Sequence, residues 1–448
     1  MRRAAFIFRR DLRLDDNTGL MAALDASQTV LPCFILNSRQ VEAHAYRSEF
    51  AFQFMLESLM DLDAQLQKKG SRLYVYWGEP ERVAQSLIAG GVDGIFVNRD
   101  YTPFSLARDA AIEMACEDAG VPFISHNDAL LFEPESVGRL YKVFSAYRRF
   151  VTQLPRRTPE RNRKTNYAAD AAADLGISEI QRRYRPNAHR AFQGGRKAGL
   201  KALAQLKKIQ SYAESREFPA IDGTSFLSAH HKFGTVSIRE TAAAADSVWG
   251  EDSVFYSELL WRDFFSHVAW YRPDVFGRAF KPRYDAISWR RDALDFGRWC
   301  EGRTGVPLVD AGMRQLNKTG YMHNRVRMVV ASFLTKDLRL DWRLGEQYFA
   351  SRLIDYDPCV NNGNWQWAAS TGCDALPYFR IFNPWRQQLR FDVRCDYIKK
   401  WCPELDALSA KEIHGLETAD NLQALAWPRP MVNHRTAAAL TLKLFRNL

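Results

Sequence analysis

Residues 4–8 read AAFIF and residues 29–36 read TVLPCFIL, two uninterrupted apolar runs of strand length. Two similar runs lie at 73–77 (LYVYW) and 94–98 (GIFVN), and helical patterns between the runs cover 46–69 and 104–119. Strands that are apolar throughout and alternate with helices are typical of a parallel, doubly wound sheet covered on both faces. The sequence therefore predicts an α/β domain over residues 1–130.

The loop after the first predicted strand reads RRDLRLDDN over residues 9–17. It lacks the Gly-x-Gly-x-x-Gly fingerprint, which argues against a dinucleotide-binding dehydrogenase. Ligands of doubly wound sheets bind at the carboxyl ends of the strands, so this loop is a candidate lining of a ligand site.

The pattern changes twice after the predicted sheet. Residues 131–199 are predicted to be an interdomain linker, and the basic, proline-flanked segment 156–164 is predicted to be mobile or laid across the first domain. From 200 to 448 the helical period prevails, most clearly in 251–270 and 307–336. We therefore expect an all-α second domain.

The 448-residue chain is 46% hydrophobic, with a formal net charge of +10 and a pI near 9.2. This surplus points to nucleic acid as a partner, with a generically basic surface as the alternative. No apolar run approaches the roughly 20 residues that a membrane span needs. Asp11 follows the basic N-terminus too soon for a signal peptide, so we expect a cytoplasmic protein.

The seven cysteines contain no Cys-x-x-Cys pair. Their odd number and wide spacing favour reduced thiols over a disulfide framework. The spacing of the last four matches no standard metal or iron–sulfur pattern, so we expect no metal site.

Tryptophan is concentrated in the second half, where residues 361–372 read NNGNWQWAASTG after Trp289, Trp299 and Trp342. Indole is easily oxidised and offers a large stacking surface, so these rings suggest electron transfer or base stacking. Packing in a core is the alternative, because indoles are often buried.

Two polar groupings are further candidates. The turn 222–228 (DGTSFLS) combines glycine with three hydroxyls before a helix, as in a phosphate cradle or an ordinary helix cap. Arg327 with Asp355-Tyr356-Asp357 suggests either the surroundings of a polar ring system or a structural ion pair.

Several long motifs resemble those of the photolyase/cryptochrome family. The flavin-binding signature of that family is similar to 353–357 (LIDYD), 361–372 and 377–384 (PYFRIFNP), and to 305–316 (GVPLVDAGMRQL) with 322–328 (MHNRVRM). RRDLRL at 9–14 and ELLWR at 258–262 also fit, and the agreement runs from residue 6 to about 407. The chain is most similar to the class I-type photolyases of cyclobutane pyrimidine dimers.

The resemblance implies an N-terminal antenna domain and a C-terminal helical domain that binds FAD. Asn361 falls where the family places the residue that faces flavin N5, and Asn there favours an enzyme over a signalling photoreceptor. The residues implied to surround FAD are Tyr212, Thr224, Ser225, Phe226, Leu227, Ser228, Arg262, Arg327, Asp355, Tyr356, Asp357 and Asn361.

The resemblance also orders the tryptophans. Trp365 would lie next to the flavin, Trp342 in the middle and Trp289 at the surface, and together they would relay electrons that reduce the cofactor. Trp299 matches no position of this relay, so we assign it to packing.

For the substrate, the resemblance implies DNA that contains pyrimidine dimers. Trp261 and Trp367 would stack on flipped-out bases, and Glu258 would hydrogen-bond a pyrimidine. Asn324 and Met328 stand where (6-4) photolyases have two histidines. Their presence favours the cyclobutane dimer as the substrate, because repair of that dimer needs an electron and no proton donor. The implied contacts to DNA are Arg216, Arg325, Arg380 and Gln387.

The implied reaction is light-driven repair by electron transfer from photoexcited reduced FAD, carried out by a monomer without an obligatory protein partner. A cryptochrome-type blue-light photoreceptor is the alternative. For a second, antenna chromophore, Phe104-Ser105 stands where folate-binding members have an Asn-Glu pair. This departure argues against folate, whereas Pro103-Phe104 and the loop Arg9-Arg10-Asp11 are compatible with a deazaflavin, a flavin or an empty site. Of these, a deazaflavin is favoured.

Overall fold

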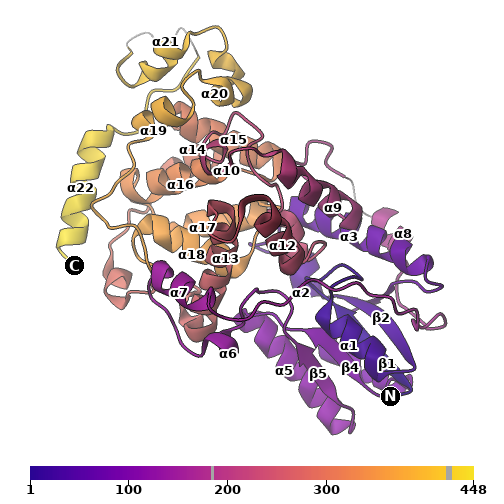
Figure 1. Ribbon diagram of the computed structural model, residues 1–448. Helices are drawn as coiled ribbons and strands as arrows, with labels where there is room; N and C mark the ends of the chain where they lie inside the picture. The colour runs from indigo at the N-terminus through magenta and orange to yellow at the C-terminus, as the bar shows by residue number, and fades with distance from the viewer. Residues whose placement is uncertain (183–185, 420–425) are drawn as a thin grey trace. The chain divides into compact units, whose positions relative to one another are not determined.

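The computed structural model describes residues 1–182, 186–419 and 426–448 (Figure 1). The chain divides into two compact units. The first, the sheet unit, comprises Met1–Ala188, Phe192–Lys208 and Ser225–Pro273. The second, the helical unit, comprises His189–Ala191, Ile209–Thr224 and Asp274–Leu448. Residues 225–273, which the sequence assigned to the helical domain, thus belong to the sheet unit.

The sheet has five parallel strands in the order β3-β2-β1-β4-β5, which confirms the predicted doubly wound α/β fold. Its strands are β1 (Arg3–Phe8), β2 (Thr29–Leu36), β3 (Tyr74–Trp77), β4 (Ile95–Asn98) and β5 (Phe123–His126). The register pairs Ile7 of β1 with Cys33 of β2. Strand β5 was not predicted, because its four residues, FISH, include two polar ones and do not form an apolar run.

The sheet unit also contains helices. They are α1 (Thr18–Ala26), α2 (Ser38–Val41), α3 (Glu49–Gln67), α4 (Pro80–Ala89), α5 (Pro103–Asp118), α6 (Pro134–Val137), α7 (Phe144–Val151), α8 (Ile177–Arg182), α9 (Arg196–Gln205), α11 (Ser228–Phe233), α12 (Ile238–Trp249) and α13 (Val254–Tyr271). Of these, α1 packs on four of the strands and α5 on β5. Side-chain caps set many of the helix starts. Ser48 accepts a hydrogen bond from the Ala51 amide at the start of α3, and Ser237 forms a capping box with Glu240 at the start of α12.

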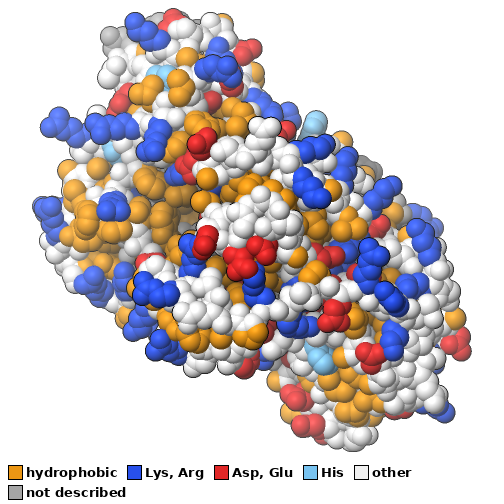
Figure 2. All heavy atoms as spheres, in the orientation of Figure 1, with side chains coloured by type: hydrophobic (Ala, Val, Ile, Leu, Met, Phe, Trp, Pro, Cys, Tyr) orange, Lys and Arg blue, Asp and Glu red, His pale blue; other side chains and the backbone are white. Residues whose placement is uncertain are grey.

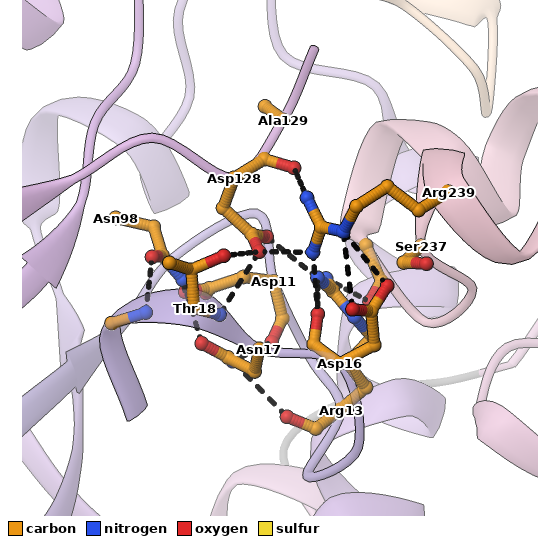
Figure 3. A network of polar contacts seen from close by, with 12 residues as sticks. Asp11, Arg13, Asp16, Asn17, Thr18, Asn98, Asp128, Ala129, Ser237 and Arg239 are labelled. Atoms are coloured by element: carbon orange, nitrogen blue, oxygen red, sulfur yellow. Dashed lines mark hydrogen bonds and ion pairs between the residues drawn. The ribbon is translucent and has the colours of Figure 1, made fainter. Parts of the chain in front are cut away.

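The loop after β1 is held by a buried network of charges inside the sheet unit (Figure 3). The Arg239 guanidinium of α12 donates to both carboxylate oxygens of Asp16, at 3.0 and 3.1 Å, and to Asp128 Oδ1 at 2.7 Å. Arg13 donates to the other oxygen of Asp128 at 2.7 Å. Burial works against ionisation, but Arg13 and Arg239 hold the pKa of Asp128 well below its usual range. The conspicuous charges of this loop therefore have a structural role.

Replacing Arg239 by methionine should lower the free energy of unfolding by about 3–5 kcal/mol, because Asp16 and Asp128 would stay buried without this cation. Denaturant unfolding followed by circular dichroism measures the loss. Arg82, an exposed arginine on α4, supplies the control, and R82M should change stability by no more than about 0.5 kcal/mol. An R239M protein as stable as the wild type would show that Arg13 alone suffices for both carboxylates.

Apart from an isolated bridge between Arg290 and Leu340, the described residues of the helical unit form helices and turns, as predicted. Its elements are α10 (Tyr212–Ser215), η3 (Pro282–Ala286), α14 (Ala293–Glu301), α15 (Pro307–Thr319), α16 (Asn324–Ser332), the π-helix η4 (Phe333–Asp337), α17 (Trp342–Arg352), α18 (Pro358–Ala369), α19 (Pro384–Phe391), α20 (Asp396–Trp401), η5 (Pro403–Leu405), α21 (Ala410–His414), η6 (Leu416–Thr418) and α22 (His434–Arg446).

The stretch 307–336, which reads as one helical face, is divided in the structure. Gly320 ends α15 in the left-handed conformation, with φ of 70°, and α16 and η4 follow. In Figure 1, α17 and α18 lie side by side. No helix among the described residues is long and apolar enough to cross a membrane.

Candidate active site

The first two turns of α16 carry the side chains Asn324 and Met328, which are predicted to face the lesion. Asn324 is exposed, and its Nδ2 lies 3.9 Å from Met328 Sδ one turn later, so the two share a helix face as expected. Arg325 forms an ion pair with Glu217, and its guanidinium lies 4.3 Å from the centre of the Phe391 ring. Part of the positive charge predicted to contact DNA is thus already balanced within the protein.

Arg327, on the same helix, is joined to the segment before α18. Its Nη2 donates to both oxygens of Asp355, at 3.1 and 2.8 Å, and its Nε donates to the Met322 carbonyl at 2.7 Å. Burial opposes the charge of Arg327, but Asp355 raises the pKa of the guanidinium above its usual value. The structure therefore brings together the ion pair that the sequence singled out.

Asn361 lies in the first half of α18, which starts at a cap by Asp357 with Pro358 in its first turn. Its Nδ2 donates to Glu346 of α17, to Oε1 at 3.0 Å and to the backbone carbonyl at 3.3 Å. Burial raises the pKa of Glu346 to about 7, although hydrogen bonds from Asn361 and Tyr356 oppose the rise. Both bonds use the amide hydrogens, so the side-chain oxygen of Asn361 remains able to accept a hydrogen bond from an N–H group.

The predicted tryptophan relay lies in the core of the helical unit. Trp365 and Trp342 are 2% and 1% exposed, whereas Trp289 is partly exposed and packs at the edge of the same cluster. Gly345 of α17 permits the close approach of α18, because a Cβ at this position would lie 2.2 Å from Trp365 Cη2. Trp299 is fully buried, and its indole N–H donates to the Val330 carbonyl at 3.3 Å, in keeping with packing.

Trp367, predicted to stack on a base, is half-buried near the end of α18 and lies 6.4 Å from the Phe382 ring. The preceding residue, Gln366, is buried and donates to the carbonyls of Val275 and Arg278, at 3.2 and 3.0 Å. The helix end that carries Trp367 is therefore fixed by buried polar contacts.

In the sheet unit, α13 carries Glu258, Trp261 and Arg262, all half-buried. One face of Trp261 is stacked on Phe144, with ring centroids 3.8 Å apart at 8°. The Arg262 Nη1 donates to the Ala129 carbonyl at 2.7 Å. Trp261 thus has aromatic support of the kind that a base-stacking platform needs.

The turn 222–228 is followed by α11, as expected from its composition. Within the sheet unit, Ser225 and Phe226 are half-buried and Leu227 is buried, while Ser228 is exposed. In the helical unit, Thr224 is half-buried, and Tyr212 lies with its ring 5.6 Å from the guanidinium of Arg216.

The remaining predicted DNA contacts lie in the helical unit. Arg380 is exposed, and Gln387 is half-buried on α19. Figure 2 shows Lys and Arg side chains spread over the visible face rather than gathered over one element. The net charge alone therefore does not locate a DNA site.

FAD presents a pyrophosphate, several hydroxyls and a ring with N–H and carbonyl groups. The helical unit offers a guanidinium (Arg327), a carboxylate (Asp355) and the side-chain carbonyl of Asn361. This donor and acceptor set fits FAD, so these are the residues that would hold it.

Two ionisable residues close to Asn361 and Arg327 were not predicted from the sequence, namely Glu346 and His323. Glu346 orients Asn361, and its only sequence signal is an acid between aromatic residues of a short helix. His323 caps α16 by accepting from the Arg325 amide at 3.2 Å. Burial, with Arg327, Arg325 and Arg216, lowers the pKa of His323 to about 4, so its imidazole is neutral at physiological pH.

Comparisons with known proteins find similar chains over most of this sequence. A protein-family model for DNA photolyase matches residues 4–163, and one for the FAD binding domain of DNA photolyase matches residues 255–447. A deoxyribodipyrimidine photo-lyase of Vibrio cholerae is 37% identical, over 98% of this chain and 98% of that protein.

Two solved structures are similar over nearly their whole lengths. An archaeal photolyase from Sulfolobus tokodaii with two FAD molecules has a TM-score of 0.92 at 41% identity, and the match covers 100% of both chains. A cryptochrome from Synechocystis has a TM-score of 0.90 at 28% identity, and the match covers 99% of both chains.

Proposed function

Because the chain belongs to the DNA photolyase family, we propose that it is a deoxyribodipyrimidine photo-lyase, which uses FAD and light to repair cyclobutane pyrimidine dimers in DNA. The full-length match to deoxyribodipyrimidine photo-lyases carries this conclusion. The polar groups of α16 and α18 support it, since they fit FAD.

In this reaction the protein binds the lesion and FAD, orients them and shields them from water. Trp261 and Trp367 stack on the extruded bases, which offsets the stacking lost in the duplex. Glu258 accepts a hydrogen bond from a pyrimidine and supports the charge that develops on it. When bound and reduced, FAD supplies the photoexcited electron that opens the cyclobutane ring and is returned afterwards.

Neither of the two side chains of α16 that we propose to face the lesion is an acid that could donate a proton. Asn324 and Met328 occupy one face of α16, and the adjacent His323 is neutral at physiological pH because of its lowered pKa. These groups suit a substrate that needs only an electron. They support the cyclobutane dimer over the (6-4) lesion.

The DNA backbone is bound by Arg216, Arg325, Arg380 and Gln387. Cations that contact phosphates contribute affinity independent of sequence, and this contribution weakens with salt. Because Glu217 already balances Arg325, we assign the larger share to the exposed Arg380.

A second chromophore in the sheet unit would act as an antenna. The sequence favours a deazaflavin, and the Sulfolobus tokodaii photolyase, 41% identical, contains two FAD molecules. Both are flavin-type rings, so we propose a flavin-type antenna. Chromatography and mass spectrometry of the released chromophores distinguish a deazaflavin from a second FAD, and a released folate would contradict both.

The test of the proposed function is light-dependent repair by the purified, chemically reduced protein. An oligonucleotide with one cyclobutane thymine dimer should recover thymine absorbance under blue light and show no recovery in the dark. Absence of repair by a protein that binds FAD and undergoes photoreduction would favour a cryptochrome-type photoreceptor, a class to which the fold is also similar.

Replacing Glu258 by alanine should lower the repair yield per absorbed photon by about tenfold, because a hydrogen bond to a charged group contributes roughly 1.5–3 kcal/mol. The FAD content should stay unchanged. Asp252, an exposed acid just before α13, gives the matched control, and D252A should repair like the wild type. An unchanged yield in E258A would remove Glu258 from the reaction.

A further inference from the structure

Lys336 lies in the π-helix η4 and is completely buried. Its Nζ donates to the carbonyl oxygen of Ala369 at 3.1 Å and to Ser370 Oγ at 2.8 Å. These two acceptors form the last turn of α18, the helix that carries Asn361, Trp365 and Trp367. A buried amine thus caps the helix at the centre of the proposed site.

No carboxylate among the described residues lies within ion-pair distance of this ammonium group. The neighbouring Asp337 is paired instead with His434 of α22, at 2.6 Å. On its other side Nζ faces the ring of Phe445, 3.9 Å from the ring centre. Burial lowers the pKa of Lys336 to about 7, so the amine is close to half protonated at neutral pH and donates hydrogen bonds in both forms.

The turn that Lys336 holds has an unusual backbone. Ser370 adopts the left-handed conformation with φ of 67°, which a residue with a side chain rarely enters without support. The amides of Thr371 and Gly372 then donate to the Gln366 carbonyl at 3.0 and 3.1 Å, and the Ser370 amide donates to the Trp367 carbonyl at 3.2 Å. The backbone of Trp367 is therefore hydrogen-bonded directly to this turn.

We propose that Lys336 is a positioning residue of α18, whose buried amine fixes the left-handed turn at Ser370 and thereby sets where Trp365 and Trp367 lie. The proposal rests on the proposed function, because it assigns these indoles to electron transfer and to lesion stacking. It adds a residue that touches neither FAD nor DNA.

If Lys336 served only to stabilise the fold, its replacement would lower the stability of the protein. We expect a different result. Exchanging an unpaired buried cation for an apolar side chain of similar length removes a desolvation penalty, so K336M should fold with equal or greater stability. If stability rises while the turn loosens and function falls, the lysine serves position rather than folding.

The experiment compares K336M, K336Q and K443M with the wild type. Glutamine keeps a neutral donor for the Ala369 carbonyl, and Lys443 is an exposed lysine on α22 that serves as the matched control. Hydrogen exchange at the amides of residues 370–372 reports on the turn directly and does not require FAD. Light-driven reduction of FAD and affinity for a dimer-containing oligonucleotide report on Trp365 and Trp367.

We expect K336M to keep its melting temperature or raise it, to exchange these amides about tenfold faster, and to bind the oligonucleotide about tenfold more weakly. K336Q should recover most of each loss, and K443M should match the wild type. Unchanged exchange and affinity in K336M, or no recovery in K336Q, would overturn the proposal. If K336M fails to fold, Lys336 serves folding rather than position, and the proposal is overturned.

Failure of the proposed function is separate from failure of this inference. A wild-type protein that does not repair dimers would refute the repair function, whatever the variants do. A wild-type protein that repairs, with K336M equal to it in exchange, affinity and photoreduction, would refute only the role of Lys336.

Discussion

Replacing Trp365 by phenylalanine should abolish most light-driven reduction of bound FAD while leaving repair by the chemically reduced protein intact. Trp365 is 2% exposed and is the indole that we place next to the flavin. Phenylalanine fills most of the space but is far harder to oxidise, so the relay through Trp342 to Trp289 would lose its first step. We expect the photoreduction rate to fall by more than about tenfold, equivalent to at least about 1.4 kcal/mol in barrier.

Trp299 provides a matched control for this variant. Its ring is fully buried in the same core, with its centroid 6.2 Å from that of Trp365, and it matches no position of the relay. W299F removes the same atoms from the same core and should lose comparable stability, yet keep photoreduction. Equal loss of photoreduction in W299F and W365F would mean that packing, and not the oxidation of Trp365, limits the reaction.

The choice of these two variants rests on what the sequence alone can specify. Four strands were predicted because each is a continuous apolar run between helical patterns, whereas β5 is short and half polar and gave no such signal. The assignment of Trp299 to packing agrees with its burial and its hydrogen bond to Val330. The roles assigned to Trp289, Trp342 and Trp365 still await the experiment.

Other features depend on contacts between distant residues and leave no local pattern. The charged residues of the loop after β1 suggested a ligand site. In the structure Arg239, more than 200 residues later in the chain, pairs with Asp16 and with Asp128 in a buried network. Glu346 and Lys336 each sit in a helix where one charged residue would ordinarily face solvent. Only the packing of α17 and η4 against α18 shows that both face inward.

Replacing Arg327 by methionine should yield a protein that is purified without FAD. Asp355, whose side chain is 4% exposed, would remain as a buried carboxylate without its cation. Breaking a buried pair in this way costs about 3–5 kcal/mol, so the melting temperature should fall as well. Flavin absorbance per protein and thermal unfolding of the purified variant measure the two effects.

If R327M loses both flavin and thermal stability, the result does not show whether Arg327 binds FAD or only stabilises the fold. A double variant separates these two roles. In R327M/D355L the buried charge is gone from both sides, and replacing a buried pair by apolar residues is often neutral for stability. We therefore expect the melting temperature to recover while the flavin stays absent, because neither side chain can then hydrogen-bond FAD. Recovery of flavin along with stability would show that the pair only shapes the helical unit and that other residues hold the cofactor.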